Sequence, residues 1–344
     1  MIVDAPLLSV VVPAYQAGGV LPECLGALAS SAFPRERWEL VVVDDASTDE
    51  TGQIAARWAD RVVTLRSPAR GPAFARNRGV EACAGAWIVF IDADVAVHPG
   101  TLVRFAKVIE DNANLDAIVG AYDDVPAAPG FLSQYRNLVH HYTHLQGGGD
   151  VATFWAGCGA VRRAAFTKVG GFDDTRYRWP QIEDIELGYR LRDQGGRIRL
   201  CPEIQATHLK RWTFRDAVRT DVWGRGVPWV RLLLERGELS VGATLNLRRG
   251  ERTKTALVGL ALVLLLGAVL WRRMEPAVLA GAVSVAVALS NMKQFAWFAQ
   301  RRGALFALAA VPMNLWYYVV SGTCVVLAIG LHLMDGRSRG ERAV

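Results

Sequence analysis

The sequence has 344 residues, of which 51% are hydrophobic, and its formal net charge is +6. Residues 245–344 carry 12 Lys and Arg against 4 Asp and Glu, so the first 244 residues have a net charge of −2. Positive charge that accompanies long apolar runs is typical of membrane flanks, and it argues against a nucleic acid as the partner.

The N-terminus does not resemble a secretory signal. The first residues, MIVDAPLLSVVVPAY, lack a basic start and include Asp4. We therefore expect no cleavable signal peptide, and an N-terminal domain that stays in the cytoplasm.

Short apolar runs alternate with helical segments from residue 7 onward. Their continuous hydrophobic character is typical of strands that are covered on both faces. This alternation predicts an α/β fold with a mostly parallel sheet and helices on both of its faces. The four predicted strands are 7–12, 38–43, 61–65 and 87–91.

Two pairs of aspartates follow predicted strands, Asp44-Asp45 in VVVDDASTDET and Asp92/Asp94 in WIVFIDADV. Ligands of parallel sheets bind beyond the carboxyl ends of the strands, so both pairs should face one crevice. The crevice does not carry two common nucleotide signatures. PAYQAGGV replaces GxGxxG after the first strand, and GxxxxGK[ST] occurs nowhere, which disfavours a dinucleotide oxidoreductase and a P-loop NTPase.

Asp92 and Asp94 should point to the same face of an extended chain, where their charges repel each other. A divalent cation between them would offset this repulsion, and Mg²⁺ or Mn²⁺ commonly binds to one or two carboxylates and substrate phosphates. Each pair also has a simpler interpretation as helix-capping or turn residues. A predicted helix begins with acidic residues at Glu183 and ends near Gly195. These residues also have a simpler interpretation, because the helix dipole favours acidic residues in a first turn.

Six segments taken together resemble glycosyltransferase family 2, whose fold is GT-A, a Rossmann-like fold for nucleotide-diphospho-sugar transferases. They cover roughly residues 7–230 in the family's order, and this order outweighs the helix-capping interpretation. The resemblance implies a nucleotide-sugar donor, a Mg²⁺ or Mn²⁺ cofactor and inversion at the anomeric carbon. The segments are VVVPAYQ, VVVDDASTDET, ARNRG, FIDADV, GCGAVRR…VGGFDD and IEDIELGYRL.

The resemblance assigns several residues to the nucleotide sugar. Pro13, Tyr15 and Asp45 would line the nucleoside pocket, and Arg76 in ARNRG would be a further nucleotide contact. Arg225 resembles part of the basic and aromatic stretch that closes over the diphosphate in processive relatives. The surrounding sequence matches that stretch imperfectly, and a basic segment before a bilayer could equally contact anionic lipid headgroups.

The same resemblance assigns the metal and the catalytic base. Asp92 and Asp94 correspond to the family's DxD pair and would bind the metal, with Asp94 favoured as the direct ligand, and Asp92 would also contact the donor. His208 lies where some members supply a third ligand, although a histidine at a strand end is often structural. Asp184 corresponds to the carboxylate that takes the acceptor's proton, with Glu183 beside it.

A second histidine-rich segment, LVHHYTHL at 138–145, places His140 and His144 on one face of a helix. No third ligand is evident, and the glutamate of an HExxH motif is absent, so a zinc site is disfavoured. We expect this helix to form a wall of the acceptor cleft or a membrane-facing surface.

Three apolar runs, 255–270, 276–292 and 303–334, follow the predicted catalytic domain at 1–235 and a basic linker at 236–254. We expect about three transmembrane helices within 255–334, with a basic tail at 335–344. Pro312 should interrupt the last run. We expect an interfacial segment before it, beginning near Lys293, and a span after it at 313–334. The alternative to membrane spans is that the apolar runs form buried core helices. Three spans would place the basic tail outside, against the positive-inside tendency.

These observations predict an inverting glycosyltransferase in the cell inner membrane. It would transfer a sugar, from a UDP-sugar by default, to a hydroxyl of a membrane-associated lipid or lipid-linked glycan at the cytoplasmic face. One alternative is transfer to a polyprenyl phosphate, and another is a catalytically silent protein that binds a sugar or lipid.

Overall fold

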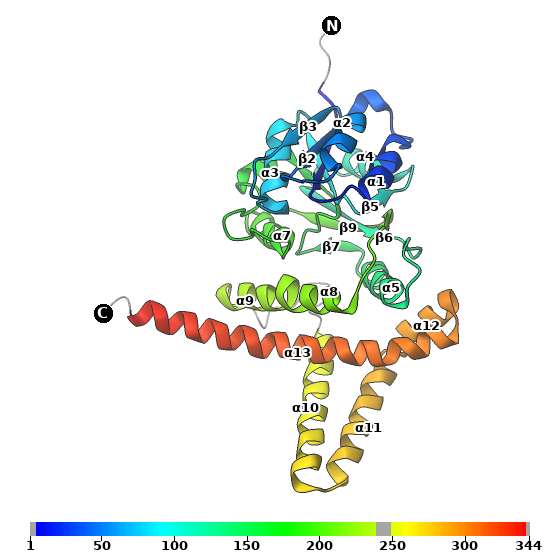
Figure 1. The fold of residues 1–344 in the computed structure, drawn as a ribbon, viewed down its shortest axis with the longest axis vertical. Coiled ribbons are helices and arrows are strands. Elements are labelled where there is room, and N and C mark those ends of the chain that lie inside the picture. Colours follow the sequence, from blue (N-terminus) through cyan, green and yellow to red (C-terminus); the bar gives the residue numbers. More distant parts are fainter. Residues whose placement is uncertain (1–4, 239–248, 342–344) are drawn as a thin grey trace. The chain divides into compact units, whose positions relative to one another are not determined.

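The computed structural model describes residues 5–238 and 249–341, which form two compact units that meet in the chain at Trp212 and Thr213 (Figure 1). The sequence predicts a catalytic domain that extends to residue 235. Residues 213–235 instead belong to the second unit, because helices in this segment pack on the C-terminal helix. The predicted linker lies partly outside the described residues, and its last six residues are already helical.

The first half of the sheet is parallel and confirms the strands predicted from the apolar runs. Its order is β3-β2-β1-β4, with β1 (Leu8–Ala14), β2 (Trp38–Asp44), β3 (Arg61–Thr64) and β4 (Trp87–Ile91). All residues of β4 are buried, as expected for a strand that is covered on both faces. The crossover helices are α1 (Leu21–Ala29), α2 (Thr51–Trp58) and α3 (Pro72–Ala82).

The second half of the sheet is mixed and extends the order to β4-β8-β6-β9-β5, while β7 also pairs with β9. Strand β8 runs antiparallel to both β4 and β6, whereas β6 and β9 are parallel. These strands are β5 (Val95–Val97), β6 (Ala117–Tyr122), β7 (Gly149–Val151), β8 (Cys158–Arg162) and β9 (Ile198–His208). The helices of this half are α4 (Thr101–Asp111), α5 (Phe131–Leu145), α6 (Arg163–Lys168) and α7 (Glu183–Asp193).

Close contact between α3 and the sheet depends on Gly79 of the ARNRG segment. A Cβ atom at Gly79 would lie 2.4 Å from Cγ1 of Val11 and 3.0 Å from Cγ2 of Val43. Real Cβ atoms do not approach other carbons this closely, so any other residue would push the helix away. Gly79 therefore sets the depth at which α3 presents Arg76 to the sheet.

The second unit is helical throughout its described residues. Helix α8 (Phe214–Arg219) leads through a π-helical turn, η2 (Thr220–Gly226), into α9 (Val227–Glu235). Helices α10 (Arg249–Trp271), α11 (Glu275–Ser290), α12 (Met292–Arg302) and α13 (Ala304–Glu341) follow. Two helices, Gly250–Trp271 and Ala304–Asp335, are long and apolar enough to cross a membrane, and a third span results if α11 and α12, bent by 62°, are counted together.

The break before α13 does not lie where the sequence predicts it. Helix α13 continues through Pro312, so our prediction that Pro312 divides this segment was wrong. The chain turns at Gly303, whose φ of +87° is available to glycine without strain. Helix α13 tolerates Pro312 because packing against neighbouring helices stabilises it. The glycine at 303 ends α12.

Candidate active site

The two aspartate pairs lie at the carboxyl ends of two strands of the parallel sheet, as the sequence predicts. Asp44 ends β2, and Asp92 directly follows β4; strand β1 lies between the two and ends at Ala14. Pro13 lies in β1 beside Val43, and Tyr15 follows the strand with 56% of its surface exposed. The carboxyl edge of the parallel strands therefore brings the predicted nucleoside and diphosphate residues to one side of the sheet.

Asp45 organises the loop that precedes α3. Its buried carboxylate accepts hydrogen bonds from the backbone N–H of Arg70 at 3.0 Å and of Gly71 at 2.7 Å. Asp44 is also buried, and its Oδ1 accepts the N–H of Ser47. The structure thus shows a loop-positioning role for Asp45, and its contact with the nucleoside stays a prediction.

Arg76 is a buried cation that joins two parts of the site. It is only 4% exposed; its Nη2 lies 2.6 Å from Oδ1 of Asp92, and its Nη1 lies 2.9 Å from Oε1 of Glu183. Burial alone would lower the pKa of Arg76, but the charges of Asp92 and Glu183 outweigh it and raise this pKa. The charge beside Asp92 in the structure is therefore an arginine, an arrangement that sequence reasoning missed.

Asp94 has a different neighbour. Its Oδ2 lies 3.8 Å from Nε2 of His208, whose ring stacks on Tyr122 at a centroid distance of 4.2 Å. Burial would raise the pKa of Asp94, but nearby His208 and the charge of Lys210 lower it below its ordinary value. Strand pairing of β5 with β9 sets this geometry, because Val95 lies opposite His208.

The described residues contain no cluster of three or more His, Cys, Asp and Glu side chains that could hold a metal by themselves. Asp94 and His208 nevertheless present one oxygen and one nitrogen 3.8 Å apart. Both donor types suit Mn²⁺. These residues would fit a divalent cation, and the substrate's phosphates would supply further ligands.

Helix α7 presents two adjacent carboxylates with different surroundings. Glu183 is buried; besides Arg76, it accepts the backbone N–H of Gln181 at 2.9 Å. Asp184 is partly exposed, and its Oδ2 accepts the N–H of Ala156 at 3.1 Å. Desolvation and the charge of Glu183 raise the pKa of Asp184 to about 6, although Arg76 opposes this shift.

The backbone around Ala156 also connects the two ends of the site. Asp92 donates its N–H to the carbonyl oxygen of Gly157, one residue after the contact with Asp184. Arg76 makes a second connection, from Asp92 to Glu183. The structure therefore holds the DxD segment and the start of α7 together in two independent ways. Arg225, in η2, belongs to the second unit and stays a predicted contact.

The histidines of α5 attach that helix to the sheet. Nδ1 of His141 lies 2.5 Å from the carbonyl oxygen of Tyr122, and Nδ1 of His144 lies 3.1 Å from that of Gly120. Burial lowers the pKa of His144 to about 4, so this ring is neutral at pH 7. The rings of His140 and His144 also pack on Trp155, one residue before the Asp184 contact.

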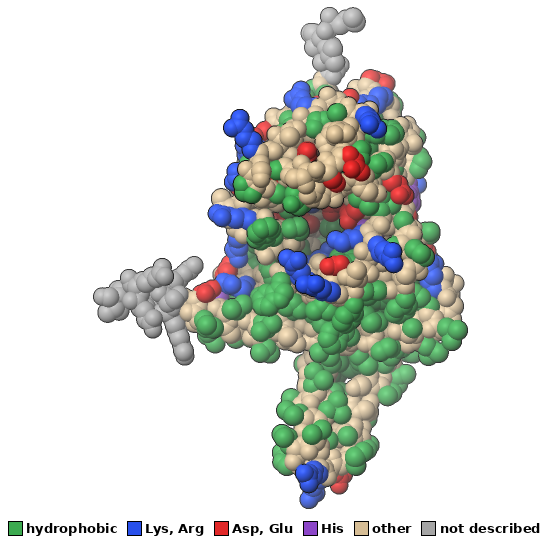
Figure 2. Space-filling model, viewed as in Figure 1, with side chains coloured by type: hydrophobic (Ala, Val, Ile, Leu, Met, Phe, Trp, Pro, Cys, Tyr) green, Lys and Arg blue, Asp and Glu red, His purple; other side chains and the backbone are tan. Residues whose placement is uncertain are grey.

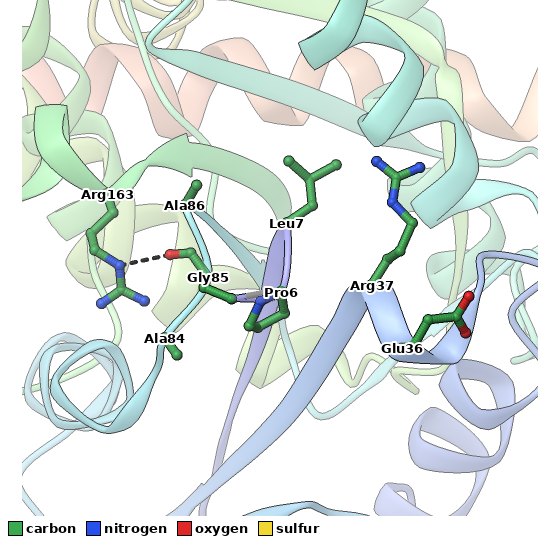
Figure 3. Close-up of a pocket in the computed structure, with 9 residues that line it drawn as sticks. Pro6, Leu7, Glu36, Arg37, Ala84, Gly85, Ala86 and Arg163 are labelled. Carbon is green, nitrogen blue, oxygen red and sulfur yellow. Dashed lines mark hydrogen bonds between the residues drawn. The ribbon is translucent and has the colours of Figure 1, made fainter. Parts of the chain in front are cut away.

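A separate pocket opens at the opposite, amino edge of β1 and β4, between Leu7, Arg37 and Gly85 (Figure 3). Its cations already have partners in the protein. Arg37 pairs with Glu110, and Arg163 donates to the carbonyl oxygen of Gly85 at 2.7 Å. None of the predicted site residues lines this pocket, which therefore does not belong to the crevice.

Comparison with known proteins shows which sequences and folds the first unit resembles. Residues 9–170 match the model for glycosyl transferase family 2, and residues 136–212 match the model for the N-terminal domain of galactosyltransferase. A probable glycosyltransferase, YdaM of Bacillus subtilis, is 28% identical over 247 residues, which are 67% of this chain and 57% of the relative. The chain spans about half the length of the curated relatives it matches.

Two solved structures share the fold at 19% identity. The mannosyltransferase PcManGT of Pyrobaculum calidifontis, in complex with GDP-Man and Mn²⁺, matches with a TM-score of 0.56 over 96% of this chain and 88% of that one. TarS 1–349 of S. aureus, in complex with UDP-GlcNAc, matches with a TM-score of 0.53 over 91% and 90%. The fold is that of a GT-A transferase domain. Residues 9–170 form a domain of the glycosyl transferase family 2 type.

Proposed function

We propose that the protein is an inverting glycosyltransferase that moves a sugar from a nucleotide-sugar donor to a hydroxyl of a membrane-associated lipid or lipid-linked glycan. The observation that carries the proposal is the pair of links between Asp92 and the start of α7, through Arg76 and through the backbone at Ala156 and Gly157. They hold a diphosphate-binding segment and a carboxylate base in a fixed arrangement, as a one-step displacement requires.

Asp184 supplies the base. A carboxylate with a pKa of about 6 is ionised at neutral pH and is a stronger base than an ordinary aspartate. As the acceptor oxygen bonds to the anomeric carbon, the bond from that carbon to the diphosphate oxygen breaks on the opposite face. The acceptor's proton passes to Asp184, the nucleoside diphosphate departs with the bonding electrons, and the configuration inverts.

Glu183 has a positioning role in this proposal. Its carboxylate is paired with the buried cation Arg76 and its side chain is only 5% exposed, whereas Asp184 is partly exposed. Glu183 fixes the first turn of α7 and raises the pKa of its neighbour. Asp184 therefore acts on the acceptor, and Glu183 acts through Asp184.

Asp94 and His208, with Asp92 beside them, would hold Mg²⁺ or Mn²⁺ together with the donor's diphosphate. A bound cation of this kind supplies Lewis-acid stabilisation to the departing nucleoside diphosphate. The structures of PcManGT with GDP-Man and Mn²⁺ and of TarS with UDP-GlcNAc support a nucleotide-sugar donor for this chain. UDP-sugars are the first donors to test, and Pro13, Tyr15 and Asp45 would form the nucleoside pocket.

The remaining expectations concern the membrane. We propose that the catalytic domain lies on the cytoplasmic side of the cell inner membrane, with residues 255–334 as the membrane region and the basic linker 236–254 at its surface. Two apolar helices in the described second unit support attachment to a membrane. A lipid acceptor would then meet the site at the bilayer surface.

Transfer by the purified full-length protein tests the proposal. Wild type in detergent, with Mn²⁺ and a panel of nucleotide sugars, should release nucleoside diphosphate and glycosylate a lipid hydroxyl acceptor. Asp184→Asn should lower transfer by at least about 10²-fold and spare donor binding. Asp111→Asn, the same change at an exposed position at the end of α4, is the matched control and should leave transfer unchanged.

The outcomes separate the alternatives. A polyprenyl phosphate is already anionic and needs no base, so undiminished transfer to it by Asp184→Asn would favour the phosphate acceptor. If wild type binds donors but transfers to no acceptor and hydrolyses none, the protein is a silent binding protein. Equal losses in Asp184→Asn and Asp111→Asn would reject the base assignment.

A further inference from the structure

A polar network that includes the buried side chains of Asn291, Asn314 and Tyr318 lies where helices of the second unit cross. The hydroxyl of Tyr318 donates to Oε2 of Glu251 at 2.8 Å, and Nζ of Lys254 donates to Oδ1 of Asn291 at 2.7 Å. Nδ2 of Asn291 then donates to Oδ1 of Asn314 at 2.9 Å. These residues come from the start of α10, the bend between α11 and α12, and the middle of α13. Ionised groups are costly at the bilayer centre, so this crossing belongs at the edge of the hydrocarbon.

Helices α10 and α11 extend from the crossing as a hairpin. The apolar part of α10, residues 255–271, is about 25 Å long at about 1.5 Å per residue, slightly less than the roughly 30 Å hydrocarbon core. Its turn carries Trp271, Arg272 and Arg273, residue types that reach for headgroups. Figure 2 shows hydrophobic side chains over the visible face of this hairpin and Lys or Arg side chains at its tip. The length of α10 and the residues of the turn favour a hairpin that crosses the bilayer.

The middle of helix α13 is hydrogen-bonded to the base of this hairpin, and its second half packs on α9. Val320, Cys324 and Ala328 are buried against Val227 of α9. A Cβ atom at Gly226 would lie 2.4 Å from Sγ of Cys324, so glycine at this position permits the close approach. The second half of α13 therefore lies beside α9 in the second unit, as Figure 1 shows.

The charged residues of α8, η2 and α9 favour a position at the membrane surface. These elements carry four arginines as well as acidic residues, and Arg231 of α9 pairs with Asp335 near the end of α13. Such helices do not enter hydrocarbon, but they lie well along an interface. Helix α13 packs on α9 up to Asp335 and should therefore lie along the same interface. Its length and composition alone do not make it a membrane span.

The opposite side of α13 is apolar and exposed. Val326 is 71% exposed, Ile329 40% and Leu333 61%, and at 100° per residue these three project away from the face that contacts α9. Arg301 and Arg302 end α12, directly before α13. An apolar face beside basic residues matches the acyl and headgroup layers of an anionic bilayer surface.

We propose that the chain crosses the membrane only through the α10–α11 hairpin, and that α12 and α13 lie along an anionic bilayer surface on the same side as α8 and α9. The C-terminus then lies on the side where the chain leaves the first unit. This proposal rests on membrane attachment in the proposed function, and it replaces the three spans expected from sequence with two.

Labelling of the full-length protein in intact cells and in inverted vesicles tests this topology. Cys introduced at Met274 in the hairpin turn should react with a membrane-impermeant maleimide only from the side opposite the N-terminus, with the unmodified chain as the background control. A tag after Val344 should be accessible on the same side as an N-terminal tag. A C-terminal tag on the opposite side would show that α13 spans, and labelling of residue 274 from the N-terminal side would show that the hairpin does not cross.

Depth gives a second, independent measurement. Spin labels at Val326→Cys in α13 and at Leu266→Cys in α10 are compared in vesicles that contain phosphatidylglycerol. The label at residue 326 should be clearly more accessible to a water-soluble relaxation agent, and equal depths would overturn the surface position of α13. Release of the wild-type protein from membranes by carbonate would instead reject membrane insertion itself. That outcome would contradict the proposed function, and it differs from every labelling result that would contradict the topology.

Discussion

Replacement of Arg76 by methionine should destabilise the catalytic domain strongly. The change removes a guanidinium that is 4% exposed and leaves Glu183, whose side chain is 5% exposed, without its cation. Two unit charges about 4 Å apart attract by roughly 4 kcal/mol at an effective dielectric constant near 20. Removal of one partner of a buried ion pair typically costs about 3–5 kcal/mol, and we expect Arg76→Met to lower the free energy of unfolding by that amount.

Urea unfolding of the full-length protein in detergent, followed by tryptophan fluorescence, measures this loss. Arg78→Met on the same helix is the matched control, because Arg78 pairs with Glu81 at the surface and such pairs contribute about 0–1 kcal/mol. The double variant Arg76→Met/Glu183→Gln should recover part of the loss, since the uncompensated charge is gone. If Arg76→Met costs no more than Arg78→Met, the buried arginine does not hold the site together.

Three further predictions concern the metal, the pH and the packing of the site. Asp94→Asn should abolish Mn²⁺-dependent donor hydrolysis, and His208→Ala should raise the Mn²⁺ concentration for half-maximal activity; an unchanged requirement in both variants would remove them from the metal site. Transfer by wild type should fall as the pH drops through about 6, because protonation of Asp184 would remove the proposed base; a rate that is constant from pH 7 to pH 5 would contradict this. Gly79→Ala should destabilise the protein by about 1–3 kcal/mol because its Cβ would lie 2.4 Å from Val11, whereas Gly26→Ala, whose Cβ would meet only Trp58 at 3.8 Å, should be neutral or stabilising in the same urea assay.

The strands and the crevice could be predicted because their signals are local. Four continuous apolar runs gave β1 to β4, and acidic residues after two of these runs placed Asp44 and Asp92 at one edge of the sheet. The partners of Arg76 could not be predicted in this way, since Glu183 lies 107 positions further along the chain. One signal was present: Arg76 occurs among small and apolar residues on the buried face of α3, and a buried cation needs anions nearby.

The membrane region shows the opposite limit of sequence patterns. Hydropathy identifies the apolar segments of α10, α11 and α13, but it does not register that α13 packs on α9 or that Asn291 bonds to Asn314. The sequence pattern favours a break at Pro312, whereas the positive φ at Gly303 is what ends α12. Tertiary contacts decide both features, and no local pattern in the sequence reports them.

The ion pairs of Arg76 have a consequence for recombining enzymes of this family. Arg76 and Asp92 belong to the first half of the domain, and Glu183 belongs to the second. A hybrid that joins this first half to another member's second half, with a neutral residue at position 183, would bury a guanidinium with only one counter-ion. Exchange of acceptor preference by domain shuffling should therefore transfer these three residues as a set.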